Sequence, residues 1–372
     1  MNSPTALVDV EDVRAHVDAV LALRVAELRD ELARSGAEAD RLADAVAVIL
    51  SGGKRLRAAF CYWSWRAHGG LPGTPREQVV LRVGAALELF QAAALFHDDV
   101  MDDSDTRRGL PAAHRTFADL HASAAWTGDA RRFGESAAIL LGDLALVLSE
   151  QAFREALTGE AQPLRTEAGA VFDLMRTEVT VGQYLDVLAQ ALPWGQDPAA
   201  DEGRAREVIR AKSARYSVEH PLVLGAVLAE AAAAEINACR AIGLPLGEGF
   251  QLRDDLLGVF GDPATTGKPV GDDLREGKRT VLVARAMARA QTAGDAGTVA
   301  MLHRELGRRD LDDDAVRTLA DAIAATGAPD DVEQLIGDLT RGALAALAGP
   351  QLSEPGRTML GRLAHAAVDR RA

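Results

Sequence analysis

Aromatic residues are scarce in this sequence, at 4% of 372 residues, and runs of β-branched or aromatic side chains are few. Strands are enriched in such residues, whereas alanine, which is abundant here, has the highest helix propensity. The scarcity therefore argues against a β-rich protein and predicts an all-α fold.

Cysteine is scarcer still, because Cys61 and Cys239 are the only two. Their spacing matches no metal-ligand pattern, and two cysteines cannot form a disulfide framework. A reducing cytoplasm is the expected compartment.

Long apolar runs and targeting signals are also lacking. No run of about 18 apolar residues is free of charge, so no transmembrane segment is expected. The N-terminal segment is acidic and has no basic start or apolar core of a signal peptide. A net charge of −14 and a pI near 5.1 argue against nucleic acid as a partner.

Helical periodicity dominates what is present. Helices are predicted over about 79–101, 135–157, 163–190, 202–230 and 234–260. The segment 191–203 is expected to be a surface connection and 262–277 a Gly/Pro-rich loop. Later helices are expected to break at Gly294, Gly327-Ala328-Pro329 and Gly349-Pro350. Because no internal repeat or low-complexity linker is present, a single helical domain over 1–372 is the simplest organisation.

A first aspartate cluster ends the apolar stretch that precedes Asp98. Asp98 and Asp102 are four residues apart, so a helix places them on one face. Such carboxylates repel each other unless a cation lies between them. An acidic helix face is usually only solvated, but such a face rarely follows an apolar stripe. His97 is expected to orient a carboxylate by a hydrogen bond rather than to bind metal.

A second cluster, Asp254 and Asp255, follows a similar apolar stretch, with Gly258 where a third carboxylate could stand. One of the two aspartates can face a metal directly while the other acts through water. Hard carboxylate oxygens completed by phosphate suit Mg²⁺ better than zinc or copper. Basic residues follow both clusters and suit the phosphate oxygens that the ion would bridge. The sequence therefore predicts a magnesium–diphosphate clamp.

The segment Gly52-Gly53-Lys54-Arg55-Leu56-Arg57 is not a nucleotide-binding P-loop, because it lacks the upstream glycine and the Ser or Thr after the lysine. Two interpretations remain. It is a helix break with exposed basic residues, or a second anion site in which Lys54 and Arg57 bind phosphate without metal.

Together, the residues resemble the trans-isoprenyl diphosphate synthases, or polyprenyl synthetases, and most of all the geranylgeranyl-type enzymes of actinobacteria. The matching segments are GGKRLR at 52–57, HDDVMDDSDTRRG at 97–109, GQYLDV at 182–187, AKSARY at 211–216, FQLRDDLLG at 250–258 and GKPVGDDLREGKRT at 267–280. The resemblance implies the isoprenoid synthase fold, a helical bundle with a central substrate cavity. It implies a core at about 45–290 and a homodimer. Residues 291–372 show no identifiable chemistry and are expected to be helices that close the bundle.

The resemblance also implies a role for each matching residue. Three magnesium ions would be held by Asp98, Asp102 and Asp254, with Asp99 and Asp255 in support. The allylic diphosphate would be held by Arg107, Lys212, Lys268 and Lys278. Isopentenyl diphosphate would be held by Lys54, Arg57, Gln91 and Arg108, where Gln91 replaces a common histidine. The path of the carbocation would be lined by Gln183, Ser213 and Gln251, where Ser213 replaces the usual threonine.

The implied reaction is the head-to-tail (1′-4) condensation of isopentenyl diphosphate with an allylic diphosphate. In such enzymes the growing chain extends along the helix below the first aspartates. Ala93 and Ala94 are small, whereas Phe90 lies about 12 Å below Asp98 at 1.5 Å per residue. With Phe90 as the floor of the cavity, geranylgeranyl diphosphate is the expected product.

Three alternatives remain from the sequence. A class I terpene cyclase also uses an aspartate cluster and magnesium, but usually has an Asn/Ser/Glu motif in place of the second cluster. A non-catalytic subunit of a heteromeric prenyl synthase typically loses one cluster. A helical scaffold with acidic patches would not explain the matched basic residues. Both clusters and the 52–57 segment favour the synthase.

Overall fold

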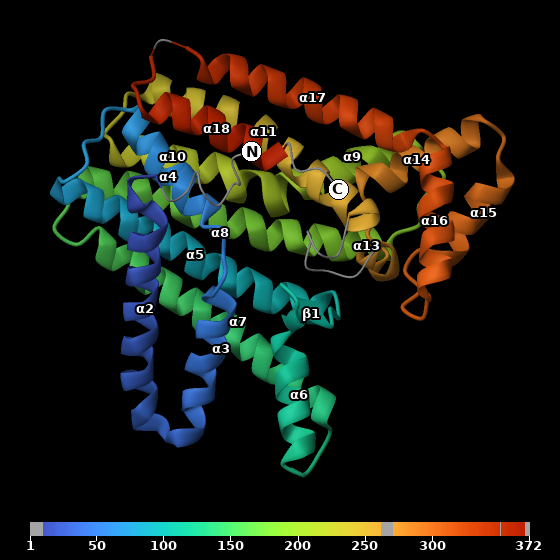
Figure 1. The fold of residues 1–372 in the computed structure, drawn as a ribbon, viewed down its shortest axis with the longest axis horizontal. Coiled ribbons are helices and arrows are strands. Elements are labelled where there is room, and N and C mark those ends of the chain that lie inside the picture. The colour runs from blue at the N-terminus through green and yellow to red at the C-terminus, as the bar shows by residue number, and fades with distance from the viewer. Residues whose placement is uncertain (1–9, 262–270, 350, 369–372) are drawn as a thin grey trace. The chain divides into compact units, whose positions relative to one another are not determined.

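The structure is a computed structural model, and it describes residues 10–261, 271–349 and 351–368. In these residues the only sheet is one short antiparallel pair of strands, and helices make up the remaining regular structure (Figure 1). The predicted all-α fold is confirmed. The chain divides into two compact units, and each is described by itself.

The first unit consists of residues 1–168, 224–232 and 353–360. Its elements are η1 (Val10–Asp12), α2 (Val13–Leu32), η2 (Ala33–Ser35), η3 (Ala37–Ala39), α3 (Asp40–Leu50), α4 (Leu56–Ala67), α5 (Pro75–Met101), β1 (Thr106–Arg107), β2 (Leu110–Pro111), α6 (Ala113–Ser123) and α7 (Ala130–Ala156). Parts of α8 (Gln162–Ala191), α10 (His220–Leu228) and α18 (Gly356–Val368) also belong to it.

The core of this unit is built around α5, which lies beside α7 and α4 (Figure 1). Helix α5 is apolar on nearly every side, as expected for a helix that neighbours surround. Close contact with α4 depends on Gly84, where a Cβ atom would lie 2.9 Å from the Ala58 Cβ. By length and composition alone, both α5 and α7 could cross a membrane. This is weak evidence for a membrane span, because the core helices of soluble proteins share these properties. Of the most apolar 18-residue stretch of α5, 78% is buried inside the protein.

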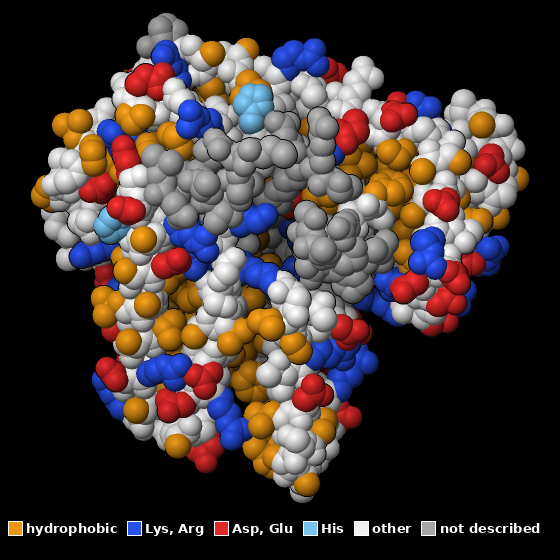
Figure 2. All heavy atoms as spheres, viewed as in Figure 1, with side chains coloured by type: hydrophobic (Ala, Val, Ile, Leu, Met, Phe, Trp, Pro, Cys, Tyr) orange, Lys and Arg blue, Asp and Glu red, His pale blue; other side chains and the backbone are white. Residues whose placement is uncertain are grey.

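Helices α2 and α3 form a hairpin whose packing follows the amphipathic pattern of the sequence. Val13, Val17, Leu21 and Leu28 are buried on one face of α2. Acidic and basic side chains mix at the closed end of the hairpin (Figure 2).

The second unit consists of residues 169–223, 233–352 and 361–372. Its further elements are α9 (Pro198–Val208), the π-helix η4 (Ile209–Glu219), α11 (Ala233–Phe260), α13 (Asp272–Glu276), α14 (Val281–Thr292), α15 (Ala296–Glu305), α16 (Asp313–Ala325) and α17 (Ala328–Leu347). Helix α11 lies against η4 and α17.

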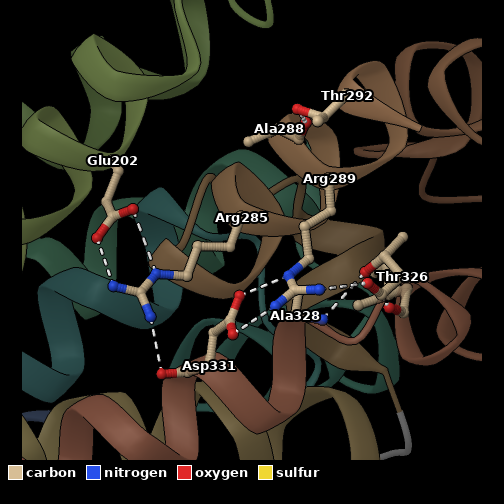
Figure 3. A network of polar contacts seen from close by, with 9 residues as sticks. Glu202, Arg285, Ala288, Arg289, Thr292, Thr326, Ala328 and Asp331 are labelled. Atoms are coloured by element: carbon tan, nitrogen blue, oxygen red, sulfur yellow. Dashed lines mark hydrogen bonds and ion pairs between the residues drawn. The ribbon is translucent and has the colours of Figure 1, made fainter. Parts of the chain in front are cut away.

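Two arginines of α14 join three helices of this unit (Figure 3). Arg285 donates to both carboxylate oxygens of Glu202 on α9 and to the Asp331 carbonyl on α17. Arg289 binds the Asp331 carboxylate in a bidentate pair at 2.5 and 2.6 Å. The planar guanidinium group suits such two-point contacts.

Several predicted boundaries changed in the structure. The helix predicted over 202–230 is three consecutive segments, α9, η4 and α10. The connection predicted at 191–203 is shorter, because Asp197 caps α9 through the Ala200 N–H and Pro198 occupies its first turn. The breaks at Gly294 and Gly327 are confirmed, but Ala328 and Pro329, predicted to be part of the second break, already belong to α17. The loop predicted over 262–277 was wrong for 272–276, which form α13, whereas 262–270 and Pro350 lie outside the described residues. The single-domain organisation stays a prediction.

Candidate active site

The first aspartate cluster lies at the C-terminal end of α5, where the apolar helix ends. Asp98 is 19% exposed, and Asp102, the C-cap residue of α5, is 3% exposed. The unbroken helix places these two carboxylates on one face, as the four-residue spacing predicted. Asp99 is buried, and both Nε and Nη2 of Arg107 donate to its Oδ1 atom.

A tight β-hairpin directs two arginines away from each other. The two strands pair Thr106 with Pro111 and Arg107 with Leu110, so Arg108 and Gly109 form the two-residue loop. Both loop residues have positive φ, 55° and 77°, which is typical of a type I′ turn. This conformation is costly for a non-glycine residue such as Arg108. Arg107 reaches back to within 3.5 Å of the Asp98 carboxylate.

Two arginines expected at the second anion site, Arg57 and Arg108, have contacts near the 51–55 turn and on α5, and the anion site itself stays a prediction. Arg108 donates to the carbonyls of Ile49 and Ser51, both at 2.9 Å. Arg57 donates to the Gln91 side chain, so the structure brings together two of the residues expected to bind isopentenyl diphosphate. Burial lowers the pKa of Arg108, the charge of Glu88 opposes this shift, and the charges of Arg55, Arg107 and Arg57 add to it. Mutual repulsion among these cations would be relieved by an anion.

Arg55 was not among the expected anion ligands, and its contacts agree with this. Its guanidinium group is buried, donates to Asp18 at 2.7 Å and to the Leu50 carbonyl, and lies 3.6 Å from Glu88. Glu88 is itself a buried residue of α5. Lys54, the next residue back, is exposed.

His97 packs on α7 over Gly142, where a Cβ atom would lie 2.2 Å from the imidazole Nε2. This nitrogen lies 3.1 Å from the Ile139 carbonyl and 3.3 Å from the Asp143 carboxylate. The carboxylate beside His97 therefore belongs to α7. The hydrogen-bond partner of His97 is the Ile139 carbonyl, so the expectation that His97 orients a carboxylate stays a prediction.

The second aspartate cluster lies near the C-terminal end of α11, within the second unit. Asp254 is half-buried, whereas Asp255 is buried and accepts a hydrogen bond from Gln251 at 2.8 Å. Burial, followed by the charges of Asp273 and Asp254, raises the pKa of Asp255 to about 8. Arg253, the residue before Asp254, does not contact the aspartates in these hydrogen bonds. It donates to the Glu333 carboxylate on α17 and to the Val368 carbonyl.

Asp273 on α13 occupies the space that a side chain at position 258 would need. A Cβ atom at Gly258 would lie 2.0 Å from an Asp273 carboxylate oxygen. Lys278 lies 2.6 Å from the Glu276 carboxylate and 3.5 Å from that of Asp273. Lys268, expected beside Lys278, lies outside the described residues.

Lys212 and Ser213 lie in the π-helix η4, and both are half-buried, as is Gln183 on α8. The Lys212 ammonium group donates to the Asp186 carboxylate at 2.6 Å. Sequence reasoning did not select Asp186, although the quoted GQYLDV segment contains it.

The residues expected to set product length follow α5 below Asp98. Phe90 and Ala93 are buried and Ala94 is half-buried. Counted back along the helix from Asp98, the small Ala94 and Ala93 come before the bulky Phe90. Leu87, one turn further, is also buried.

The donors at both clusters fit magnesium in their chemistry. In the described part of the chain, no three His, Cys, Asp or Glu side chains are grouped closely enough to hold a metal by themselves. Mg²⁺ usually binds one or two carboxylates and completes its shell with water and substrate phosphates. Two carboxylates with cationic side chains nearby are therefore a suitable half-site.

Comparison with known proteins decides the family. Residues 39–323 match the family model of the polyprenyl synthetases. The chain belongs to the polyprenyl synthetase family. It is 32% identical over 265 residues to geranylfarnesyl diphosphate synthase of Aeropyrum pernix. The matched region covers 68% of this chain and 72% of that protein. It is 34% identical over 241 residues to geranylgeranyl diphosphate synthase of Mycobacterium tuberculosis, covering 64% and 59%.

A solved structure is similar over nearly the whole chain. It is geranylgeranyl pyrophosphate synthase from Corynebacterium glutamicum, complexed with isoprenyl diphosphate and magnesium. The TM-score is 0.88 at 36% identity, with 97% of this chain and 100% of that chain covered. The predicted isoprenoid synthase fold, the actinobacterial resemblance and the assignment as a prenyltransferase that elongates prenyl chains are confirmed.

Proposed function

We propose that this enzyme condenses isopentenyl diphosphate with allylic diphosphates in a magnesium-dependent 1′-4 reaction, with geranylgeranyl diphosphate as the main product. The supporting observation is that the three aspartates at the end of α5 differ in their positions and contacts. Asp98 and Asp102 share one face, whereas Asp99 accepts two hydrogen bonds from Arg107. This pairing supports two carboxylates directed to metal and one that fixes a diphosphate-binding arginine.

Asp98, Asp102 and Asp254 would hold three magnesium ions, with Asp99 and Asp255 in support. When bound, magnesium supplies positive charge to the diphosphate oxygens. Asp98 and Asp102 lie at the end of α5, and Asp254 lies on α11, so regular backbone rather than a loop holds each of these carboxylates.

The reaction begins when the allylic C–O bond breaks and its electron pair leaves with the diphosphate. Arg107, Lys212 and Lys278 stabilise the negative charge on this leaving group. Lys54, Arg57, Gln91 and Arg108 hold isopentenyl diphosphate so that its double bond attacks the allylic carbon, which is an orientation effect. A proton then leaves the adjacent carbon to form the new double bond, and the released diphosphate accepts it.

Product length follows from the side chains below Asp98. Ala93 and Ala94 leave room for a farnesyl chain, and Phe90 closes the cavity below them. Because Phe90 is buried, its ring is held by its neighbours and can act as a fixed floor.

The active form would be a homodimer in the cytoplasm. Phe133, Leu140 and Val147 are seven residues apart on α7 and are 37, 62 and 54% exposed. Their spacing places them on one face of the helix, and a second copy would cover it. Sedimentation of the wild type and of Leu140→Glu tests this: the variant should dissociate, and an unchanged dimer would place the interface elsewhere.

Incorporation of labelled isopentenyl diphosphate tests the reaction itself. Purified protein is supplied with Mg²⁺ and separately with dimethylallyl, geranyl or farnesyl diphosphate. Acid-labile, lipid-soluble label should appear with an allylic starter and disappear when EDTA removes the metal. A cyclic hydrocarbon formed without isopentenyl diphosphate would indicate a terpene cyclase. Failure of every starter would indicate a non-catalytic subunit.

A further inference from the structure

The second unit contains a long π-helical segment, η4, at residues 209–219. π-Helical hydrogen bonding is rare, is mostly limited to a single turn, and is often found at functional sites. Here it extends over 11 residues and contains Lys212 and Ser213. The backbone of this segment therefore needs support from its neighbours.

Helix α8 touches the η4 backbone at a glycine. A Cβ atom at Gly182 would lie 2.3 Å from the Lys212 backbone nitrogen and 2.7 Å from its Cα. A second approach comes from α11, where a Cβ atom at Gly247 would lie 2.3 Å from the Ala214 carbonyl oxygen. These neighbours are backbone atoms, which cannot rotate away as the end of a side chain can.

The same face of α8 also holds the other end of Lys212. Asp186 is four residues after Gly182, which is one helical turn. Its carboxylate accepts a hydrogen bond from the Lys212 ammonium group at 2.6 Å. Helix α8 thus fixes Lys212 at two points, its backbone at Gly182 and its charged end at Asp186.

We propose that Gly182 is a positioning residue for Lys212. By lacking a side chain, it sets the separation of α8 and η4 at which the Lys212 ammonium group is presented to the allylic diphosphate, and Asp186 holds that group until the substrate arrives. The inference rests on the proposed function, in which Lys212 binds the leaving diphosphate. It assigns a role to two residues of the 182–187 segment.

The size of the expected effect follows from the geometry. A methyl group at position 182 requires the contact with the Lys212 nitrogen to open by about 1 Å before ordinary contact is reached. A misplacement of about 1 Å in a catalytic arrangement can lower the rate on the order of 100-fold.

The test compares Gly182→Ala with Gly169→Ala on the same helix. Gly169 is the matched control because a Cβ atom there would meet nothing within 4 Å. We expect Gly182→Ala to lower kcat/KM for farnesyl diphosphate about 100-fold, with the KM for isopentenyl diphosphate unchanged, and Gly169→Ala to match the wild type. Equal losses toward both substrates would indicate general damage to the fold and overturn the proposal.

A double-mutant cycle shows whether the effect passes through Lys212. In a Lys212→Ala background, Gly182→Ala should cost little more, because the group it positions is already absent. Additive losses would overturn the proposal. If Gly182→Ala does not fold, Asp186→Asn decides: an increased KM for farnesyl diphosphate supports positioning by α8, and an unchanged KM contradicts it.

Binding of farnesyl thiolodiphosphate, whose C–S bond does not ionise, separates this inference from the proposed function. Calorimetry should show tight binding by the wild type and by Gly169→Ala, and weaker binding by Gly182→Ala. Wild-type protein that fails to bind the probe or to extend farnesyl diphosphate would refute the proposed function. Wild-type binding that Gly182→Ala retains would refute only the positioning role.

Discussion

Arg107 donates two hydrogen bonds to a single oxygen of Asp99 and lies 3.5 Å from the Asp98 carboxylate. The arginine is thereby held beside the aspartate pair to which magnesium would bind. A diphosphate bound here would meet metal and guanidinium together. The contact explains how three neighbouring aspartates can have different roles on one helix.

Asp98 and Asp99 should respond differently to substitution. Asp98→Asn should lower kcat on the order of 100- to 1,000-fold, as the loss of one transition-state contact does elsewhere, and should raise the Mg²⁺ concentration needed for half-maximal rate. Asp99→Asn should mainly raise the KM for the allylic diphosphate, because it releases Arg107. Steady-state kinetics at several Mg²⁺ concentrations measure both effects.

Asp103→Asn is the control for this comparison. Asp103 is close in sequence but pairs with Arg115 and approaches Arg131, so its loss should leave the magnesium dependence unchanged. If the Asp98 and Asp99 variants showed the same kinetic pattern, the assignment of metal binding to Asp98 and of Arg107 positioning to Asp99 would be wrong.

Product length should respond to two residues of α5 in opposite directions. Ala94→Phe should stop growth near fifteen carbons, because the ring fills the cavity one turn below Asp98. Phe90→Leu should give products longer than twenty carbons, because it lowers the floor. Chromatography of the dephosphorylated alcohols measures both.

The buried Phe60 on α4 supplies the control, since Phe60→Leu also removes an aromatic ring from the core. It should lower stability but leave the product unchanged. Wild-type product from both α5 variants would exclude these positions as determinants of length.

Stability should fall in mild acid because of His114. This side chain is 2% exposed, and burial followed by the neighbouring Arg115 lowers its pKa, which Asp103, Asp105 and Glu135 only partly oppose. The unfolded state, with a pKa near 6.5, then binds the proton more readily. The stabilisation is complete above about pH 6.5 and is lost as pH falls toward the folded-state pKa.

Urea unfolding at about pH 7.5 and pH 5.5 measures this component. The decrease in unfolding free energy should be larger for the wild type than for His114→Leu, which has no group to protonate there. Equal decreases in the two proteins would assign the acid sensitivity to other groups.

Two carboxylates of the second unit should differ in their effect on stability. Glu248 is buried and binds Arg206 at 2.5 Å and Arg210 at 3.3 Å, so Glu248→Ala should cost about 3 kcal/mol by removing the buried partner of Arg206, whereas Arg210 keeps Glu207 at 2.9 Å. Asp331 pairs with the half-exposed Arg289, so Asp331→Ala should cost about 1 kcal/mol or less. Chemical denaturation measures both, and equal costs would show that burial does not set the difference.

Much of the fold and of the site could be predicted from the sequence because local rules decide them. Periodicity gave the long helices, and the four-residue spacing of Asp98 and Asp102 fixed their common face. The Arg57–Gln91 contact could be expected only through the family resemblance, because the two residues are 34 positions apart.

Features that depend on tertiary contact were missed. The π-helix has no propensity signal in Ile209–Glu219, and it became visible only with the glycine contacts of its neighbours. The pairing of Asp186 with Lys212 depends on how α8 meets that segment. The Asp273 carboxylate beside Gly258 likewise follows from packing of α13 on α11, which spacing alone does not predict.

The most direct measurement is the product formed from farnesyl diphosphate, isopentenyl diphosphate and Mg²⁺, identified by mass after dephosphorylation. A linear twenty-carbon alcohol, formed only when both substrates are present, is the predicted result. A cyclic hydrocarbon formed from farnesyl diphosphate alone would contradict the account, as would recovery of unchanged farnesol.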